Sequence, residues 1–379
     1  MALYIGLMSG TSADAIDAAL VEISEKSVEL ISSYQLPITT NVRSAVYQLA
    51  LDHSGEIEQI RYLDKTIADL SCKAIENLCA KTETKKTAIR AIGSHGQTVR
   101  HYPASDGQRG YSLQVGDPNI IAETTGITTV ADFRRRDIAA GGQGAPLAAG
   151  FHRTAFHNRS NDRVIVNIGG IANITYLPRQ ADVIGFDTGP GNGLMDSWFQ
   201  QHHQGSFDSD GHWAASGNVD KKLLSQLLKH SFLTLPIPKS TGREEFNLPW
   251  LQEQLALCSQ KTSAADIQAT LLAFTTETIA NHIDKVDPQK HSEIYICGGG
   301  SHNRQLMKNL TLKLQPRHVA TTLALGIHPD WVEAIAFAWL AKQTLQGSTG
   351  NVPSVTGASR ETVLGGIYWG ADSTTRRAC

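Results

Sequence analysis

The chain has 379 residues, which exceeds one ordinary core and suits two domains with a cleft between them. Its 34 Lys and Arg residues nearly balance 36 Asp and Glu residues, so the formal net charge is −2. This balance argues against a broad nucleic-acid or anionic membrane surface. The apolar start ends at Ser9 and has no basic segment before it, and no other apolar run is long enough to cross a bilayer. We therefore expect a soluble, cytoplasmic protein with neither a nucleic-acid nor a membrane partner.

The cysteines indicate a reducing compartment. They are five in number, scattered, and never spaced as Cys-x-x-Cys. An odd, scattered set does not suit a disulfide framework or a zinc site. We expect free thiols at Cys72, Cys79, Cys258, Cys297 and Cys379.

The first half of the chain opens with strands and a long helix. Apolar and alternating patterns predict three strands, at residues 3–8, 18–23 and 28–36. Residues 56–80 carry apolar side chains three or four apart, which predicts a helix that covers the first sheet. Residues 91–150 are rich in Gly, Gln, Thr and Asp, with short strand-like pieces at 120–122 and 128–131. Polar loops of this kind often form clefts.

The second half repeats this pattern. Strands are predicted at residues 164–168 and 174–177, on either side of Gly169-Gly170, and they echo the strand, turn and strand of the N-terminus. A helix at 265–283 starts with Ser263 and Asp266 as a capping pair. A strand at 294–297 and helical segments at 303–310 and 333–341 follow. The alternation in both halves predicts a duplicated α/β architecture with active-site loops at strand ends.

Three glycine-rich turns, each after a predicted strand, are the most informative pattern. They are Gly10-Thr11-Ser12, Gly169-Gly170 and Gly298-Gly299-Gly300. A single such turn is usually only a tight turn, but three in a regular strand context favour backbone amides that bind phosphate. The chain contains no Gly-Lys dipeptide, and no Gly-x-Gly-x-x-Gly opens a helix after the first strand. These absences disfavour P-loop and Rossmann enzymes, and the missing Gly-x-Ser-x-Gly and His-Glu-x-x-His motifs disfavour simple hydrolases and zinc proteases.

Three acidic residues are candidates for chemistry. Asp187 follows a predicted strand and precedes a rigid Gly-Pro-Gly turn, so its carboxylate is placed to act as a general base or simply to cap the turn. Asp14 and Asp17 lie on or beside the first glycine turn. They are placed to hold water around Mg²⁺, which needs only one or two carboxylates, or to serve as turn residues.

Motifs spread over nearly the whole chain resemble anhydro-N-acetylmuramic acid kinases. They are MSGTSADAID at 8–17, SHGQT at 94–98, NIGGIAN at 167–173, DTGPGN at 187–192, KSTGRE at 239–244, CGGG at 297–300 and PSVTGA at 353–358. The set occurs in order and is specific as a whole.

The resemblance implies two duplicated ribonuclease-H-like α/β domains of the actin, hexokinase and sugar-kinase superfamily, with an ATP cleft between them. Residues 1–140 would carry the first phosphate loop and part of the sugar site, and residues 141–379 the second phosphate loop, the catalytic Asp and the adenosine-side glycine turn. The implied reaction uses ATP, with Mg²⁺, and water to convert 1,6-anhydro-N-acetylmuramic acid into N-acetylmuramic acid 6-phosphate and ADP in peptidoglycan recycling. The implied assembly is a homodimer.

The resemblance also implies roles for individual residues. Asp187 would activate the water that opens the anhydro bridge at C1, while the freed O6 takes the γ-phosphoryl group. The implied nucleotide contacts are Gly10, Thr11, Ser12, Ala13, Asp14, Ala15, Ile16 and Asp17 in the first loop, Asn167, Gly169, Gly170 and Asn173 in the second, and Gly298, Gly299 and Gly300 beside the adenosine. The implied sugar contacts are His95, Gln97, Thr98, Arg135 and Glu333.

Some of these positions have simpler explanations. His95 and His101 have no carboxylate partner at ligand spacing, so no metal site is expected there. Arg135 belongs to a run of three arginines, of which one is assigned to a substrate carboxylate or phosphate and the others to the surface. Glu333 equally suits a solvated residue at a helix start. Ala15 stands where many family members have glycine, so a positive φ at this position would strain the loop.

Three rival functions remain open on the sequence. The first is another sugar or acetate-type kinase of the same superfamily, which only the segment around Asp187 separates from the first assignment. The second is an ATPase whose nucleotide state drives partner binding, although the chain shows no extra substrate domain. The third is a glycoside hydrolase with paired carboxylates, which would not need three phosphate-type turns.

Overall fold

The computed structural model describes residues 1–25, 27–51, 56–102, 109–242, 244–258 and 262–371. Its internal contacts divide the chain into two compact units, Met1–Ala155 with Trp331–Cys379, and Phe156–Asp330. These units differ from the predicted division at residue 140 in two respects: residues 141–155 belong to the first unit, and so does the end of the chain. The segment that begins at Trp331 returns to the first unit, because its long helix packs on the first sheet.

The first unit is built on a mixed sheet. Strands β1 (Ala2–Ser9), β2 (Ala15–Ile23) and β3 (Val28–Pro37) are antiparallel, as expected from the sequence. The other strands are β4 (Ile89–Tyr102), β5 (Tyr111–Val115), β6 (Thr129–Ala131) and β12 (Gly366–Tyr368). Among the described residues the strand order is β12-β6-β4-β1-β2-β3, with β4 parallel to β1 and to β6, and with β5 also paired to β4.

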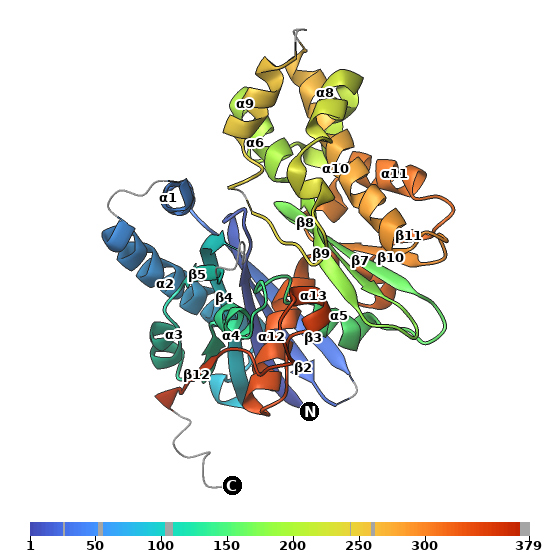
Figure 1. The fold of residues 1–379 in the computed structure, drawn as a ribbon. Helices are drawn as coiled ribbons and strands as arrows, with labels where there is room; N and C mark the ends of the chain where they lie inside the picture. The colour runs from blue at the N-terminus through green and yellow to red at the C-terminus, as the bar shows by residue number, and fades with distance from the viewer. Residues whose placement is uncertain (26, 52–55, 103–108, 243, 259–261, 372–379) are drawn as a thin grey trace. The chain divides into compact units, whose positions relative to one another are not determined.

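Helices cover both faces of this sheet (Figure 1). Ile5 and Leu7 of β1 belong to a buried apolar cluster that includes the inner face of α2 (Glu56–Thr82), as the spacing in α2 predicted. On the opposite face, a Cβ atom on Gly6 or on Gly93 would overlap the backbone of α12 (Val332–Leu345). These two glycines therefore let a helix from the end of the chain lie directly on the first sheet.

The second unit repeats the core of the first sheet. Its strands are β7 (Arg163–Ile168), β8 (Ile171–Leu177), β9 (Ile184–Pro190), β10 (Glu293–Cys297) and β11 (Val319–Thr321). Their order is β11-β10-β7-β8-β9, with β7, β8 and β9 antiparallel and with β10 parallel to β7 and β11. The same order and directions relate β6, β4, β1, β2 and β3. This repeat confirms the predicted duplication of a ribonuclease-H-like domain.

Helix α10 (Ala264–Val286) supplies much of the second core. Its buried apolar residues pack with those of β7, including Val164 and Val166. The Ser263 hydroxyl oxygen accepts a hydrogen bond from the Asp266 N–H at 3.1 Å, which confirms the predicted cap.

The remaining α-helices are shorter. They are α1 (Thr40–Leu51), α3 (Pro118–Thr125), α4 (Phe133–Ala139), α5 (Ala149–Phe156), α6 (Gly193–His202), α7 (His212–Ser216), α8 (Lys221–Leu227), α9 (Leu248–Ala256), α11 (Arg304–Lys313) and α13 (Pro353–Thr356).

Two predictions for residues 91–150 were wrong. The strand predicted at 120–122 lies inside helix α3, which begins with an Asp117 side-chain cap and Pro118 and ends at Gly126 in the left-handed conformation. The segment from residue 91 to Tyr102, predicted as loop, belongs to β4, whose Gly and Gln residues are held in a strand by pairing with β1 and β5. Long-range pairing here outweighs weak local propensity.

Two further expectations concern the membrane and the thiols. Within the described segments, no helix combines the length and apolarity that crossing a membrane requires. The four cysteines in the described residues, Cys72, Cys79, Cys258 and Cys297, form no disulfide, in agreement with the predicted thiols. Cys379 lies outside the described residues.

Candidate active site

The first glycine turn connects β1 to β2. The Ala13 N–H donates to the Gly10 carbonyl oxygen at 3.1 Å and closes the turn, and the Tyr47 hydroxyl of α1 donates to the Ser12 carbonyl oxygen at 2.6 Å. Thr11 and Asp14 are exposed, and Asp14 Oδ1 accepts a hydrogen bond from the Ser12 hydroxyl at 2.5 Å. The turn is thus held by the Tyr47 hydroxyl of α1 and exposes the polar side chains of Thr11 and Asp14.

Ala15 does not have a positive φ, so the condition for backbone strain at this position is not met. Ala15 is an extended residue of β2, paired with Pro37, whereas Ala13 has a φ of 46°. Ala13 and Ile16 have buried side chains, so their side chains belong to the core. Asp17 also lies in β2, where it accepts a hydrogen bond from Gln35 Nε2 at 2.9 Å.

Gln97 supports this turn from β4. Its Nε2 donates to the Gly10 carbonyl oxygen at 3.2 Å, and its Oε1 accepts from the Ser9 hydroxyl at 2.6 Å. The Gln97 side chain is fully buried. Thr98 Oγ1 accepts a hydrogen bond from Gln114 Nε2 at 3.1 Å. The structure therefore places Gln97 against the first turn, and its contact with the sugar stays a prediction.

The second turn, Gly169-Gly170, joins β7 to β8 and occupies the position equivalent to the first turn in the repeated sheet. Residues 191–193, which follow β9, bind this turn through backbone hydrogen bonds. The N–H groups of Gly191 and Gly193 donate to the Gly170 carbonyl oxygen at 3.0 and 3.1 Å, and the Asn192 N–H donates to the Gly169 carbonyl oxygen at 2.8 Å. The two motifs therefore form one structure.

The third turn leaves the same end of the second sheet, because β10 is parallel to β7. Gly298 has a φ of 79°, and a Cβ atom there would overlap Asn167 Oδ1. Asn173 lies on β8 opposite Asp187 of β9. The structure thus gathers the predicted residues of the second unit around one sheet end.

Each turn contains one glycine that the fold itself does not require. Gly10, Gly169 and Gly299 do not have a positive φ. A Cβ atom at these positions would lie no closer than 3.8, 3.6 and 3.8 Å to its nearest neighbours, which is ordinary contact or open space. By contrast, a Cβ atom on Gly300 would overlap the Ile168 side chain. The absent side chains leave the backbone open to close approach by a ligand, which fits the binding of phosphate.

Asp187 is a buried carboxylate of β9, in the same unit as the second and third turns. It is 6% exposed, and its Oδ2 accepts a hydrogen bond from the Thr241 N–H at 2.9 Å. Its own N–H donates to the Lys239 carbonyl oxygen at 3.0 Å. A carboxylate held in a fixed direction suits a general base.

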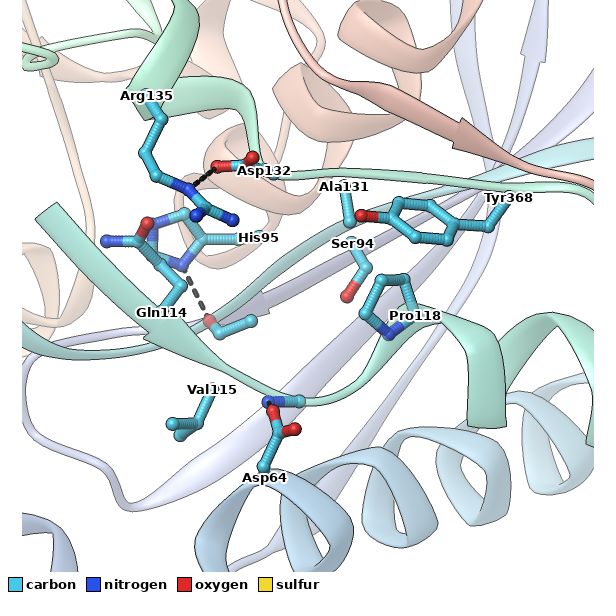
Figure 2. A pocket seen from close by; sticks show the side chains of 12 residues that line it. Asp64, Ser94, His95, Gln114, Val115, Pro118, Ala131, Asp132, Arg135 and Tyr368 are labelled. Atoms are coloured by element: carbon cyan, nitrogen blue, oxygen red, sulfur yellow. Dashed lines mark hydrogen bonds and ion pairs between the residues drawn. The ribbon is translucent and has the colours of Figure 1, made fainter. Parts of the chain in front are cut away.

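The first unit contains a polar pocket of about 60 Å³. The pocket lies beside β4 where this strand changes its partner. β4 pairs with β6 up to Gly93 and with β5 from Gln97 onward. Figure 2 shows His95 and the Arg135–Asp132 ion pair on one side of the pocket and Asp64 and Pro118 on the other. The remaining lining residues are Ser94, Gly96, Gln114, Val115, Gly116, Ala131 and Tyr368.

His95 is held as a neutral ring. Its Nδ1 donates to the Gly96 carbonyl oxygen at 2.7 Å, so Nε2 accepts from the Arg134 guanidinium, whose Nε lies at 3.1 Å. Burial and the Arg134 charge lower the pKa of His95 to about 3. Arg134 also donates to the Gly144 carbonyl oxygen at 2.7 Å.

The pocket includes some of the predicted sugar contacts. His95 and Arg135 line it, with Arg135 Nε 2.6 Å from Asp132 Oδ1. Gln97, Thr98 and Glu333 do not belong to its lining, and Glu333 lies in the first turn of α12.

Several polar lining residues were missed by the sequence analysis. They are Asp64, Ser94, Gln114, Asp132 and Tyr368. Asp64 lies on the helix expected only to cover the sheet, and Tyr368 lies near the end of the chain, so no local pattern marks either as part of a site. Burial raises the pKa of Asp64. In the described part of the chain, no group of three or more His, Cys, Asp or Glu side chains is arranged to hold a metal ion.

Comparisons with known proteins agree over nearly the full length. A family model described as anhydro-N-acetylmuramic acid kinase matches residues 2–370. A protein of that name from Shewanella sp. (strain MR-4) is 50% identical over 368 residues, covering 97% of this chain and 98% of the relative. One from Shewanella loihica is 49% identical with the same coverage. Among solved structures, a ROK family glucokinase from Streptomyces griseus is 13% identical, with a TM-score of 0.43 and coverage of 90% of this chain and 99% of that one.

Proposed function

Because the chain belongs to the anhydro-N-acetylmuramic acid kinase family, we propose that it phosphorylates 1,6-anhydro-N-acetylmuramic acid with ATP. In this reaction water opens the 1,6-anhydro bridge and O6 takes the γ-phosphoryl group. The products are N-acetylmuramic acid 6-phosphate and ADP, which places the enzyme in peptidoglycan recycling. The observation that carries the proposal is the oriented, buried Asp187 in the same unit as two glycine turns whose backbone is open to phosphate.

Asp187 acts as the general base. Its Oδ2 is tied to the Thr241 N–H, which fixes the plane of the carboxylate. The carboxylate takes a proton from water as that water attacks C1, and the C1–O6 bond breaks. O6 then develops negative charge, and bonding to the γ-phosphorus relieves it. Ring opening and phosphorylation therefore depend on each other.

The glycine turns bind the nucleotide. In the first unit, the turn at Gly10 offers its backbone to phosphate oxygens, and Gln97 holds the turn in shape. In the second unit, the turn at Gly169 has the equivalent role, and the turn at Gly298–Gly300 lies beside the adenosine. Asp14, exposed on the first turn, is the residue that would hold water around Mg²⁺. When bound, Mg²⁺ neutralises phosphate charge.

The pocket of the first unit binds part of the sugar. Arg135 supplies a cation next to it, and a guanidinium suits the lactyl carboxylate of the substrate. Neutral His95 is held by Arg134 and gives the pocket a wall of fixed shape. Glu333 at the start of α12 is a further candidate for sugar contact.

Three further proposals concern location and assembly. The cysteines of the described residues are not joined in disulfides, which supports the cytoplasm. The near-balanced charge supports a protein without a nucleic-acid partner. We also propose a homodimer, for which β3 is a candidate surface because it is a ten-residue edge strand with Ile31 48% exposed.

A coupled assay tests the function. ADP release is measured with ATP and Mg²⁺, in the presence and absence of 1,6-anhydro-N-acetylmuramic acid, and with N-acetylglucosamine or acetate as the competing acceptor. We expect ADP release that requires the anhydro sugar. ADP release without any sugar would identify an ATPase, and a preference for another acceptor would identify a different kinase. Ring opening without ATP would identify a glycoside hydrolase.

A further inference from the structure

The segment from Lys239 to Thr241 holds Asp187 from two sides. The Lys239 carbonyl oxygen accepts the Asp187 N–H at 3.0 Å, and the Thr241 N–H donates to Asp187 Oδ2 at 2.9 Å. One bond fixes the backbone of the residue and the other fixes its carboxylate. The position of this short segment therefore sets the direction of the carboxylate.

The Lys239 side chain anchors this segment in the protein interior. Lys239 is 4% exposed, and its Nζ donates to the carbonyl oxygens of Phe232 and Leu233 at 2.9 and 3.2 Å. The third partner is His282 Nε2, at 2.9 Å. His282 Nδ1 lies 2.7 Å from the Thr278 carbonyl oxygen and must donate to it, so Nε2 is an acceptor. An ammonium has three hydrogens, and these partners account for all of them.

The groups that face Lys239 define its charge. Burial and the Lys285 charge on α10 lower the pKa of Lys239 to about 8, whereas Asp187 and Glu245 raise it. Burial lowers the pKa of His282 to about 4, so this ring stays neutral. Lys239 is therefore mostly protonated at neutral pH. Electrostatic coupling is reciprocal, and the Lys239 charge in turn favours the ionised Asp187 carboxylate.

We propose that Lys239 is a positioning residue for Asp187, because its buried ammonium anchors the segment that orients the carboxylate. This inference rests on the proposed function, in which Asp187 is the base. Lys239 acts through Asp187 and does not touch the sugar or ATP. Its three hydrogens are used within the protein, unlike those of a lysine that binds phosphate.

The test is a set of pH–rate profiles for the sugar, from pH 5 to 9.5, with wild type, Lys239→Met, Lys239→Arg and Lys285→Met. In Lys239→Met we expect the acid limb of kcat/KM to move to higher pH, because the charge that favours the ionised carboxylate is gone. We expect kcat at pH 7.5 to fall about ten-fold, because Asp187 is no longer held in position. The KM for ATP should stay within about two-fold of wild type, because the nucleotide contacts are unchanged. Lys239→Arg keeps a positive charge, so its acid limb should match that of wild type. Its alkaline limb should move to higher pH, because arginine does not lose its proton in this range as Lys239 does.

Lys285→Met is the matched control. It removes a cation from the same neighbourhood but leaves the three Lys239 hydrogen bonds in place, so its acid limb should match that of wild type. An acid limb in Lys239→Met that coincides with wild type, or an equal shift in Lys285→Met, would overturn the inference. If wild type shows no sugar-dependent ADP release, the proposed function fails instead.

A second measurement covers the case in which neither Lys239 variant folds. The Lys239 side chain is then followed by NMR of ¹³C-labelled lysine in wild type and Asp187→Asn. Loss of the Asp187 charge should make the Lys239 amine titrate at lower pH, since Asp187 raises its pKa. Identical titration in the two proteins would contradict the inference.

Discussion

Gln97 and Gly10 are 87 positions apart in sequence, yet Gln97 Nε2 donates directly to the Gly10 carbonyl oxygen at 3.2 Å. The other end of the same amide accepts the Ser9 hydroxyl at 2.6 Å. The side chain is fully buried, so water cannot replace either bond. The shape of the first turn therefore depends on a residue of a different strand.

Gln97→Met removes these two hydrogen bonds, and a third from Nε2 to the Thr98 carbonyl oxygen, at nearly constant volume. The Ser9 hydroxyl and the Gly10 carbonyl then lose a buried partner, so we expect the free energy of unfolding to fall by about 1–3 kcal/mol. The KM for ATP should rise, because the turn is no longer held. Urea unfolding and ATP titrations measure the two effects. Gln35→Met is the control, since Gln35 bonds Asp17 at an exposed site, and an equal change there would contradict this prediction.

Gly10→Ala and Gly10→Val test whether ligand approach explains this glycine. The fold has room for a Cβ atom there, so Gly10→Ala should melt close to wild type. Stabilisation by saturating Mg·ATP follows RT ln(1 + [L]/Kd), and we expect this gain to shrink in Gly10→Ala and to vanish in Gly10→Val. Thermal unfolding with and without Mg·ATP is the measurement. An unchanged gain in Gly10→Val would mean that the loop is only a turn.

Asp187→Asn keeps the size of the side chain and an oxygen to accept the Thr241 N–H, but it removes the basic carboxylate. We expect ATP and sugar to bind as in wild type, while turnover falls by about 10²- to 10⁴-fold. Single-turnover kinetics and binding titrations separate the two. Turnover within a few-fold of wild type would exclude Asp187 as the base.

Isotopic water distinguishes ring opening from simple phosphate transfer. In ¹⁸O-labelled water, rapidly quenched wild-type product should carry the label at C1 of the sugar, with none on the phosphate. Mass spectrometry locates the label. Label in inorganic phosphate, with the sugar ring still closed, would indicate ATP hydrolysis and contradict the mechanism.

Buried histidines make the fold sensitive to acid. Burial lowers the pKa of His152 to about 3, while the unfolded chain keeps the ordinary value of 6.5. Between these two pH values the unfolded state binds a proton that the folded state does not. The contribution of His152 to the free energy of unfolding is therefore fully present above pH 6.5 and is lost as the pH falls toward 3. The free energy of unfolding of wild type falls as the pH is lowered from 6.5 to 5, and in His152→Gln this fall should be smaller by about 2 kcal/mol.

Urea unfolding at several pH values checks this change. His212→Gln is the matched control, because His212 is exposed and its replacement should keep the wild-type pH dependence. An equal effect of the two substitutions would show that burial of His152 is not the cause.

Local patterns predicted much of the fold but less of the site. The first strands and the Ser263 cap follow from alternation and capping, which depend on neighbours in sequence. Strand β4 was missed because its polar residues are held by pairing with β1 and β5, which no local pattern reveals. The cap of α3 at Asp117 was visible in the sequence and was overlooked.

The site residues show the same limit. Motifs identified Asp187 and the three turns, and the structure brings the turns of the second unit together. The bond between Arg134 and His95 joins residues 39 positions apart, and the pocket includes Tyr368 from the end of the chain. The resemblance assigned Gln97 to the sugar, and no sequence pattern showed that its amide bonds the Gly10 carbonyl oxygen and the Ser9 hydroxyl. Which partner a polar side chain takes depends on contacts between distant segments.

The close packing of α12 on Gly6 and Gly93 has a consequence for folding during synthesis. A ribosome makes the strands of the first sheet early, but it adds the helix that covers one of their faces only after residue 331. The second unit, by contrast, is one uninterrupted stretch of chain. The second unit is therefore complete on the nascent chain while the older sheet still exposes an apolar face. The part of the protein that is synthesised first is the last to close its core.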